Sequence, residues 1–280
     1  MAKHLVGAAL WSLAMDDTVA SIEKVKEIGY EAVQLTFRRP SDATPEGVER
    51  IREALERTGL AVPAACIIFP GEDYSSIESI RATGGFIDPA DFPDRLEQCK
   101  VWSQAFADLG IDNVTVHAGF IPPAGDPAHD DFMERFATAV DAVHEAGLTI
   151  GLETGQESAE HLLAAIDELG RDYLTVNFDP ANFVLYGTDD PQEAARLLGP
   201  RTSNAHMKDG TASDRPGEVW GEDVPLGTGE VPLEGVIRTL QEGGFDGALI
   251  VEREAGDDRV GDLTRARETL EVLLAKMEGE

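Results

Sequence analysis

The sequence is poor in cysteine, in aromatic residues and in lysine. Its 280 residues include two cysteines, 6% aromatic residues and 23 basic residues, of which six are lysines. Cys66 and Cys99 lie too far apart for a metal motif and are too few for a disulfide scaffold. We interpret them as small buried residues in a reducing compartment, and we expect a cytoplasmic location.

The scarcity of basic residues excludes several kinds of partner. Against 23 bases stand 53 acids, which gives a formal net charge of -30. Such a charge repels phosphate backbones and anionic membrane surfaces. In addition, no apolar run approaches the roughly 20 residues that a membrane span needs. We therefore expect neither nucleic acid nor a membrane as a partner.

The acids are spread along the chain on the faces of expected helices. Because 42% of the residues are hydrophobic, this charge does not indicate disorder. An acidic surface that is poor in lysine is typical of a salt-accumulating halophile, since it stays soluble when charges are screened. We expect a halophilic source and, among halophiles, an archaeon.

Short apolar runs alternate with helical patterns from end to end. Near-continuous apolar runs are typical of strands that are covered on both faces, as in parallel sheets. There are eight such runs: LVGAALWSL, EAVQLTF, LAVPAACIIF, NVTVHAG, LTIGLET, LTVNFDP, SNAHMKD and GALIVERE. We expect helices over 17–29, 45–58, 88–109, 128–146, 158–169, 190–199, 232–243 and 259–279. Eight strand and helix pairs predict a single (β/α)8 TIM barrel over residues 1–280.

The alternative fold is a doubly wound sheet. That fold would bring a glycine-rich phosphate-binding fingerprint after the first strand, and the segment ALWSLAMDD has none. Two longer insertions, near 70–87 and 211–231, follow the third and seventh apolar runs. They belong to the face of a barrel on which active sites form, so we expect them to act as lids.

Four potential metal ligands end the last four apolar runs: Glu153, Asp179, His206 and Glu252. They are separated by 26, 27 and 46 residues. The first two separations match one barrel repeat of roughly 30 residues, and the last contains the insertion at 211–231. The spacing therefore predicts that all four lie on the same rim.

The set of four indicates a metal site better than any one member does. A single acid at a strand end is more often a helix cap, and a lone histidine is more often a hydrogen-bonded core residue. Four charged or polar groups at the ends of apolar strands are costly unless they share a partner. Three carboxylates and one imidazole suit one Mn²⁺, Mg²⁺ or Co²⁺ ion, and Zn²⁺ stays open.

Further candidates surround these ligands. Lys208 lies two residues after His206, so strand alternation keeps it on the same side, and we assign it to substrate contact or charge balance. The catalytic candidates are thus Glu153, Glu252 and Lys208. The substrate-binding candidates are His117, Asn182, Trp11, Phe37 and Glu254. A buried structural role explains His117 equally well, and a core position explains the two aromatic residues equally well.

Four segments carry a resemblance to a known family: FDPANFVLYGTDDP, HMKDG, PLGTGEVPLEGVIRTLQEGGFDGALIVERE and LET. They resemble the xylose isomerase-like sugar phosphate isomerase/epimerase superfamily, and the similarity covers nearly the whole chain. The resemblance implies a TIM barrel with one divalent ion held by Glu, Asp, His and Glu from the last four strands. These positions match Glu153, Asp179, His206 and Glu252. It also implies that the ion binds adjacent oxygens of a ketose or related polyol.

The chemistry implied by this resemblance is proton transfer through a metal-stabilised enediolate. A carboxylate is needed on each face of the substrate, and Glu153 and Glu252 fill that role. The sequence departs from the family at Asn182, where ketose 3-epimerases commonly carry a histidine. An amide can form a hydrogen bond with a hydroxyl but cannot titrate, so this residue argues against a ketose 3-epimerase in particular.

Other functions stay open at this point. An inosose-type dehydratase of the same superfamily would expel a β-hydroxyl from the enolate. A hydrolase related to AP endonucleases would need more histidines and would meet DNA against a repulsive field. A sugar-binding barrel without catalysis and a homo-oligomer are both compatible with the sequence.

The charge balance generates the first prediction. Raising KCl from about 0.1 M to about 2 M should raise the Tm, because salt screens the repulsion between the acids. Scanning calorimetry measures this midpoint. A Tm that stays constant over the range would contradict the halophile interpretation.

Overall fold

The computed structural model describes residues 4–279 of the chain. Eight parallel strands form one sheet in the order β2-β1-β10-β7-β6-β5-β4-β3. Their bounds are β1 (Val6–Ala9), β2 (Ala32–Gln34), β3 (Ala65–Ile67), β4 (Asn113–Val116), β5 (Thr149–Glu153), β6 (Leu174–Phe178), β7 (Thr202–Met207) and β10 (Ala248–Val251). Between β2 and β3 two isolated parallel bridges, Ala32 with Ala61 and Leu35 with Ala65, nearly close the barrel. The predicted fold class is confirmed.

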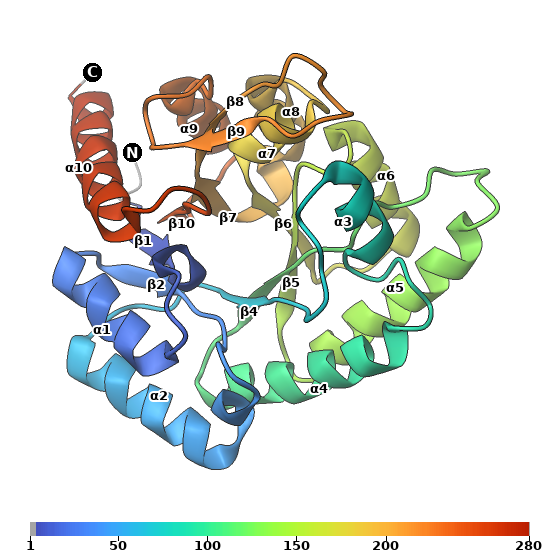
Figure 1. Cartoon of the computed structure of the whole chain (residues 1–280), viewed down its shortest axis with the longest axis horizontal. Helices are drawn as coiled ribbons and strands as arrows, with labels where there is room; N and C mark the ends of the chain where they lie inside the picture. Colours follow the sequence, from blue (N-terminus) through green and yellow to red (C-terminus); the bar gives the residue numbers. More distant parts are fainter. Residues whose placement is uncertain (1–3, 280) are drawn as a thin grey trace.

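Helices surround the strands (Figure 1). Each of the eight expected helical segments contains one helix, and the boundaries differ by a few residues at most. These helices are α1 (Thr18–Ile28), α2 (Pro45–Thr58), α4 (Phe92–Asp108), α5 (His129–His144), α6 (Ala159–Leu169), α8 (Pro191–Leu198), α9 (Leu233–Glu242) and α10 (Arg259–Glu278). The start of β1 lies near the last turns of α10, since Val6, Leu274 and Met277 line one cavity.

Local sequence signals explain where these helices begin and end. The side chains of Asp17, Thr44 and Ser158 each accept a hydrogen bond from an amide in the first turn of the helix that follows. Gly29 and Gly59 end α1 and α2 in the left-handed conformation, with φ values of 103° and 64°. Residues with a Cβ rarely adopt this conformation, so glycine ends the helix and turns the chain toward the next strand.

Several elements lie outside the eight repeats. They are the helices α3 (Ile77–Thr83) and α7 (Pro180–Tyr186), the hairpin strands β8 (Asp209–Thr211) and β9 (Glu222–Val224), and the short 3₁₀ turns η1 (Leu10–Leu13), η2 (Pro40–Ala43) and η3 (Gly199–Arg201). The expected insertion at 70–87 contains α3, and β9 lies within the expected insertion at 211–231. The first insertion follows β3, and the second follows β7.

The apolar core runs from the strands into the surrounding helices. Among its largest fully buried side chains are Phe106, Phe132, Phe136, Phe178 and Phe183. They come from α4, α5, β6 and α7, so one core joins the barrel to its outer layer. Over the described part of the chain, no helix has the length and hydropathy to cross a membrane.

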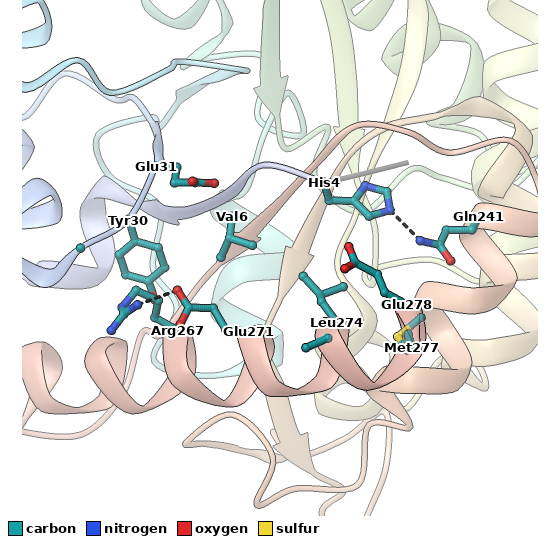
Figure 2. Close-up of a pocket in the computed structure, with 12 residues that line it drawn as sticks. His4, Val6, Tyr30, Glu31, Gln241, Arg267, Glu271, Leu274, Met277 and Glu278 are labelled. Carbon is teal, nitrogen blue, oxygen red and sulfur yellow. Dashed lines mark hydrogen bonds and ion pairs between the residues drawn. The ribbon is translucent and has the colours of Figure 1, made fainter. Parts of the chain in front are cut away.

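A cavity of about 280 Å³ opens at the amino-terminal end of the barrel (Figure 2). His4 at the start of β1 and Tyr30 before β2 face α10 across it. The polar groups in this cavity pair with one another: His4 Nε2 lies 2.8 Å from Gln241 Nε2, and Arg267 donates to Glu271 at 2.5 Å. This end of a TIM barrel contributes to stability, and active sites form at the other end.

Candidate metal centre and its pocket

The four predicted ligands meet at the carboxyl ends of the strands. Glu153 ends β5, Asp179 follows β6, His206 lies in β7 and Glu252 follows β10. One donor atom of each residue lies within 4.8 Å of the others, and all four side chains are buried. The structure thus brings together the residues whose spacing predicted a common rim.

Strand register explains this meeting. Glu153 pairs in register with Asn177 on β6, and His206 pairs with Ile250 on β10. Asp179 lies two residues beyond Asn177, and Glu252 lies two residues beyond Ile250. Side chains two residues apart on an extended chain point to the same side, so the carboxylates converge on the imidazole.

Gln34 fixes the orientation of the imidazole. The Oε1 atom of Gln34 lies 2.7 Å from His206 Nε2, and its Nε2 atom donates to Thr115 Oγ1 at 2.9 Å. Because the amide oxygen faces the ring, Nε2 donates to Gln34 and Nδ1 is the ring atom that faces the carboxylates. Burial lowers the pKa of His206, but Glu252 and Glu153 outweigh it and hold the pKa well above its usual range, so Nδ1 would release a proton when a cation binds. Nδ1 lies 3.4 Å from both Glu153 Oε1 and Glu252 Oε2. The sequence analysis did not identify Gln34. The feature that could have indicated its role is that it is a single polar residue within the apolar run of β2.

The two glutamates are held in similar ways. Each directs one carboxylate oxygen toward His206 Nδ1. The other oxygen of Glu153 lies 3.3 Å from His117 Nε2, and the other oxygen of Glu252 accepts a hydrogen bond from Trp11 Nε1 at 2.6 Å. Trp11 and His117 therefore orient the two glutamates from opposite sides of the centre.

Asp179 has two separate roles. Its Oδ1 atom accepts from the amides of Ala181 and Asn182 at 2.8 and 3.1 Å, which caps α7. Its Oδ2 atom is buried and has no hydrogen-bond partner among residues 4–279. Oδ2 lies 3.7 Å from both His206 Nδ1 and Lys208 Nζ. A buried carboxylate oxygen without a donor fits a cation ligand.

Lys208 is a buried cation next to the four ligands. Its Nζ atom lies 3.0 Å from Glu252 Oε2, 2.6 Å from Glu254 Oε2 and 3.5 Å from Asn182 Oδ1. Burial lowers the pKa of Lys208, but Glu252 and Glu254 outweigh it and hold the pKa well above its usual range. The amine therefore stays charged and neutralises part of the acid cluster.

The pKa values of the acids divide them into two groups. Burial raises the pKa of Glu252, but Lys208 and His206 bring it well below its usual range. Burial likewise opposes ionisation of Glu153, and two histidines lower its pKa below the usual value. Burial dominates at Asp179 and raises its pKa. The two glutamates therefore ionise more readily than Asp179.

Asn182 connects the β5 loop with α7. Its Nδ2 atom donates to Glu153 Oε1 at 3.3 Å and to the carbonyl of Thr154 at 3.1 Å. Gly155 makes this contact sterically possible. It has a φ of 125°, and a Cβ built there would lie 2.1 Å from the Cβ of Asn182.

A cavity of about 440 Å³ opens beside the four ligands. This volume falls within the range of about 300–1,000 Å³ that is typical of small-molecule sites. Among the predicted residues, it is lined by Trp11, His117, Asn182, Lys208 and Glu254, with Glu153 and Glu252. Its further walls were missed by the sequence reasoning: Cys66, Glu72, Tyr74, Tyr186, Trp220 and Asp223. The two predicted insertions contain four of these residues: Glu72, Tyr74, Trp220 and Asp223. Because the insertions were expected on the active-site face, their position was the sequence signal that could have identified these four as wall residues.

Phe37 corrects one expectation. It does not line the cavity, because its ring stacks on Phe106 at a centroid distance of 4.5 Å and packs against Trp102 at 5.3 Å. Phe37 lies three residues beyond the end of β2, so the alternation of the strand no longer fixes its side. Its ring belongs to the core under α4 instead of the wall of the site.

A family model for xylose isomerase-like TIM barrels matches residues 22–276. The chain belongs to this family. The resemblance drawn from the sequence segments is thereby confirmed, and the buried cluster at the strand ends fits the family.

Individual relatives extend this finding. A xylose isomerase domain protein from Planctomyces limnophilus is 32% identical, with a TM-score of 0.88 over 92% of this chain and 94% of that one. The putative L-ribulose-5-phosphate 3-epimerase UlaE of Shigella dysenteriae is 24% identical over 91% of this chain and 89% of that protein. A xylose isomerase-like TIM barrel protein from Mycobacterium smegmatis, solved in complex with magnesium, shares the fold at 18% identity. Its TM-score is 0.74 over 98% of this chain and 97% of that one.

Replacing one ligand without disturbing its helix cap tests the metal centre. Asp179→Asn keeps an oxygen for the amides of α7 but replaces the carboxylate oxygen that faces the cluster. We expect Mn²⁺ affinity to fall at least about tenfold, or about 1.4 kcal/mol, as measured by titration calorimetry.

Asp190→Asn is the matched control for this experiment. Asp190 caps α8 through the amides of Gln192 and Glu193 in the same way, but it is exposed and outside the cluster. Its variant should bind Mn²⁺ normally. Equal affinity in the two variants would remove Asp179 from the site.

A further buried acid lies outside the lining of this cavity. Glu157, in the loop between β5 and α6, accepts a hydrogen bond from the amide of Ile121 at 2.8 Å. Burial raises its pKa from about 4.5 to about 7. Between these pH values the folded chain binds more protons than the unfolded chain, so stability falls as the pH rises through this window.

Removing this charge should stabilise the protein at high pH. Glu157→Gln keeps an acceptor for Ile121, and we expect a gain of about 3 kcal/mol at pH 8 that disappears near pH 4. Urea unfolding of both proteins at the two pH values measures the gain. Glu160→Gln removes an exposed acid of α6 and should show no such difference. A gain that is the same at both pH values would contradict the assignment.

Proposed function

We propose that the protein is a divalent-metal-dependent sugar isomerase or epimerase that works by proton transfer. The observation that carries this proposal is the buried cluster of Glu153, Asp179, His206 and Glu252 beside a cavity that fits a small molecule. Family membership supports it, as do relatives whose names describe sugar epimerases.

The donor set fits a divalent cation. Three carboxylates and one imidazole nitrogen offer oxygen-rich coordination, which suits Mn²⁺, Mg²⁺ or Co²⁺, with Zn²⁺ also compatible. The orphaned Oδ2 atom of Asp179 and the oriented Nδ1 atom of His206 support this assignment. When bound, such an ion supplies Lewis acidity that polarises a carbonyl and stabilises negative charge on oxygen.

Glu153 and Glu252 are the proposed bases. They come from β5 and β10, which β6 and β7 separate in the barrel, so they approach a bound substrate from different sides. One carboxylate removes the proton from a carbon next to the carbonyl. The other glutamate, after taking a proton from solvent, returns it to the opposite face, which inverts the carbon. Return of a proton to the neighbouring carbon, with transfer of the hydroxyl proton to the former carbonyl oxygen, moves the carbonyl instead.

Local contacts prepare both glutamates for this role. Positive neighbours lower their pKa values, so both carboxylates can accept a proton at neutral pH. His117 and Trp11 each hold the outer oxygen and fix the plane of the carboxylate. The amide of Asn182 cannot titrate, so it contacts substrate oxygens and leaves proton transfer to the glutamates.

The remaining walls supply binding contacts. Trp11, Tyr186 and Trp220 offer apolar faces that suit the C–H faces of a sugar, and the rings of Tyr186 and Trp220 lie 4.4 Å apart. Lys208 and Glu254 offer a donor and an acceptor for substrate hydroxyls. This combination of a polar centre and an aromatic wall favours a small polyhydroxylated substrate.

A dehydratase is the second candidate function. Elimination of a β-hydroxyl needs a proton donor close to the base, and Lys208 Nζ lies 3.0 Å from Glu252 Oε2. This lysine could protonate a leaving hydroxyl as well as contact a retained one. The two functions differ in product, because elimination removes water and forms an unsaturated or diketone compound.

Solvent exchange tests the proposed proton transfer. With metal-loaded enzyme in D₂O, deuterium should enter the reacting carbon of recovered substrate or product, as followed by NMR and mass spectrometry. Glu153→Gln and Glu252→Gln should each lower the rate by about 10²-fold or more, because an amide cannot take the proton. Metal affinity should fall less than turnover.

Glu160→Gln serves as the control for the loss of one negative charge, since Glu160 is exposed on α6. It should retain the wild-type rate and deuterium content. Full retention of the original hydrogen, together with near-normal rates in both site variants, would exclude proton transfer by these glutamates.

A further inference from the structure

The pocket carries an excess of negative charge. Besides Glu153 and Glu252, its lining includes the carboxylates of Glu72, Asp223 and Glu254. The lining offers two basic side chains, Lys208 and His117. His117 already faces a carboxylate oxygen of Glu153 at 3.3 Å. A bound divalent ion would offset Glu153 and Glu252, so the rest of the lining sets three carboxylates against Lys208 and His117, which disfavours an anion.

Lys208 is committed to neighbouring carboxylates. Its amine lies 2.6 Å from Glu254 and 3.0 Å from Glu252, with Asp179 at 3.7 Å. A phosphate group would have to displace Glu254 and would still lie beside that carboxylate. Two like charges at this separation repel each other, and the buried setting weakens screening by solvent.

The arginines at the rim are occupied as well. Arg253 is buried between Asp223 and Asp262, and its Nε atom donates to Asp262 at 2.9 Å. Arg259 donates to the backbone carbonyls of Arg253 and Glu254, and also to the carbonyl of Gly256 at 3.0 Å. Both guanidinium groups stabilise the loop after β10, so their donors are used in these contacts instead of being directed into the cavity.

Asp209 fills the glycine-rich turn at the same rim. Its Oδ2 atom accepts from the amides of Gly227 and Gly229 at 2.9 and 2.8 Å, and its Oδ1 atom accepts from Gly210 and Val231 at 2.9 and 3.1 Å. Clustered backbone amides of this kind form anion sites when they are open. Here the protein's own carboxylate takes that position.

We infer that the site binds a sugar or polyol without a phosphate group. This inference rests on the proposed function and specifies its substrate class. Carboxylates accept hydrogen bonds from hydroxyls, and the aromatic walls suit C–H faces, so a neutral polyhydroxylated molecule matches the lining. A terminal phosphate would enter a lining of acids beside Lys208, His117, Arg253, Arg259 and the turn at Gly227–Gly229, each of which already has a partner. The chain would then differ from the relative from Shigella dysenteriae, whose name specifies a sugar phosphate.

Matched pairs of ligands test this inference. L-ribulose, D-allulose, D-tagatose and D-fructose would each be compared with their own terminal phosphate ester, using the Mn²⁺-loaded protein. Both members of a pair offer the same oxygens to the metal, so the difference reports the phosphate group. We expect titration calorimetry to give at least tenfold tighter binding for the free sugar in the pair that binds best, with kcat/KM following the same order.

A single variant tests the role of Lys208. Glu254→Gln removes one of its carboxylate partners and should shift the ratio of ester to free-sugar affinity toward the ester by at least threefold. Glu78→Gln removes an exposed charge of α3 that does not line the pocket, and its ratio should equal that of the wild type. An unchanged ratio in Glu254→Gln would overturn the argument from the paired lysine.

The outcomes separate this inference from the proposed function. Tighter binding of the esters would overturn the inference and leave proton transfer intact. Binding of free sugars without turnover or deuterium exchange would support the inference and count against the proposed function. Failure of every sugar and every ester to bind would overturn both.

Discussion

The close approach of three buried carboxylates is the constraint on which the rest of the site depends. Glu153, Asp179 and Glu252 meet around His206 within 4.8 Å. At an effective dielectric constant near 20, each pair of charges about 4 Å apart costs about 4 kcal/mol. The chain offsets this repulsion with the Lys208 amine, the imidazole and the amides that begin α7. A divalent ion would complete the balance, since Oδ2 of Asp179 has no donor among the residues that the structure describes.

The barrel can hold this arrangement because strand pairing fixes the register up to the carboxyl ends of the strands. Parallel pairing places Glu153 level with Asn177, and His206 level with Ile250, before any loop begins. At the amino-terminal end of the barrel the loops are short, and several begin with a left-handed glycine that ends the preceding helix. The carboxyl end carries α3, α7 and the β8–β9 hairpin. Packing therefore fixes the ligands, and the longer loops are free to shape the cavity around them.

Sequence patterns predicted the features that depend on periodicity, which are the strands and the spacing of the ligands along the chain. Apolar runs located all eight strands, and the repeat length placed four ligands on one rim. The prediction failed where a residue lies beyond a strand, as at Phe37, because alternation fixes the side only within extended chain. Gln34 was missed because its role depends on a contact across the barrel with His206. The helix α7 was missed because its seven residues follow Asp179 directly and begin at Pro180, so no loop separates them from the apolar run of β6.

Charge on this protein acts in two physically separate places. The surface acids are exposed, so salt screens their mutual repulsion, and stability should depend on ionic strength. The acids of the site are buried and neutralised by specific partners at short distance, so screening affects them much less. Lys208 shows the difference, because one of only six lysines in the chain is enclosed among carboxylates instead of exposed to solvent. The electrostatics of the site can therefore persist at salt concentrations that change the interactions of the surface.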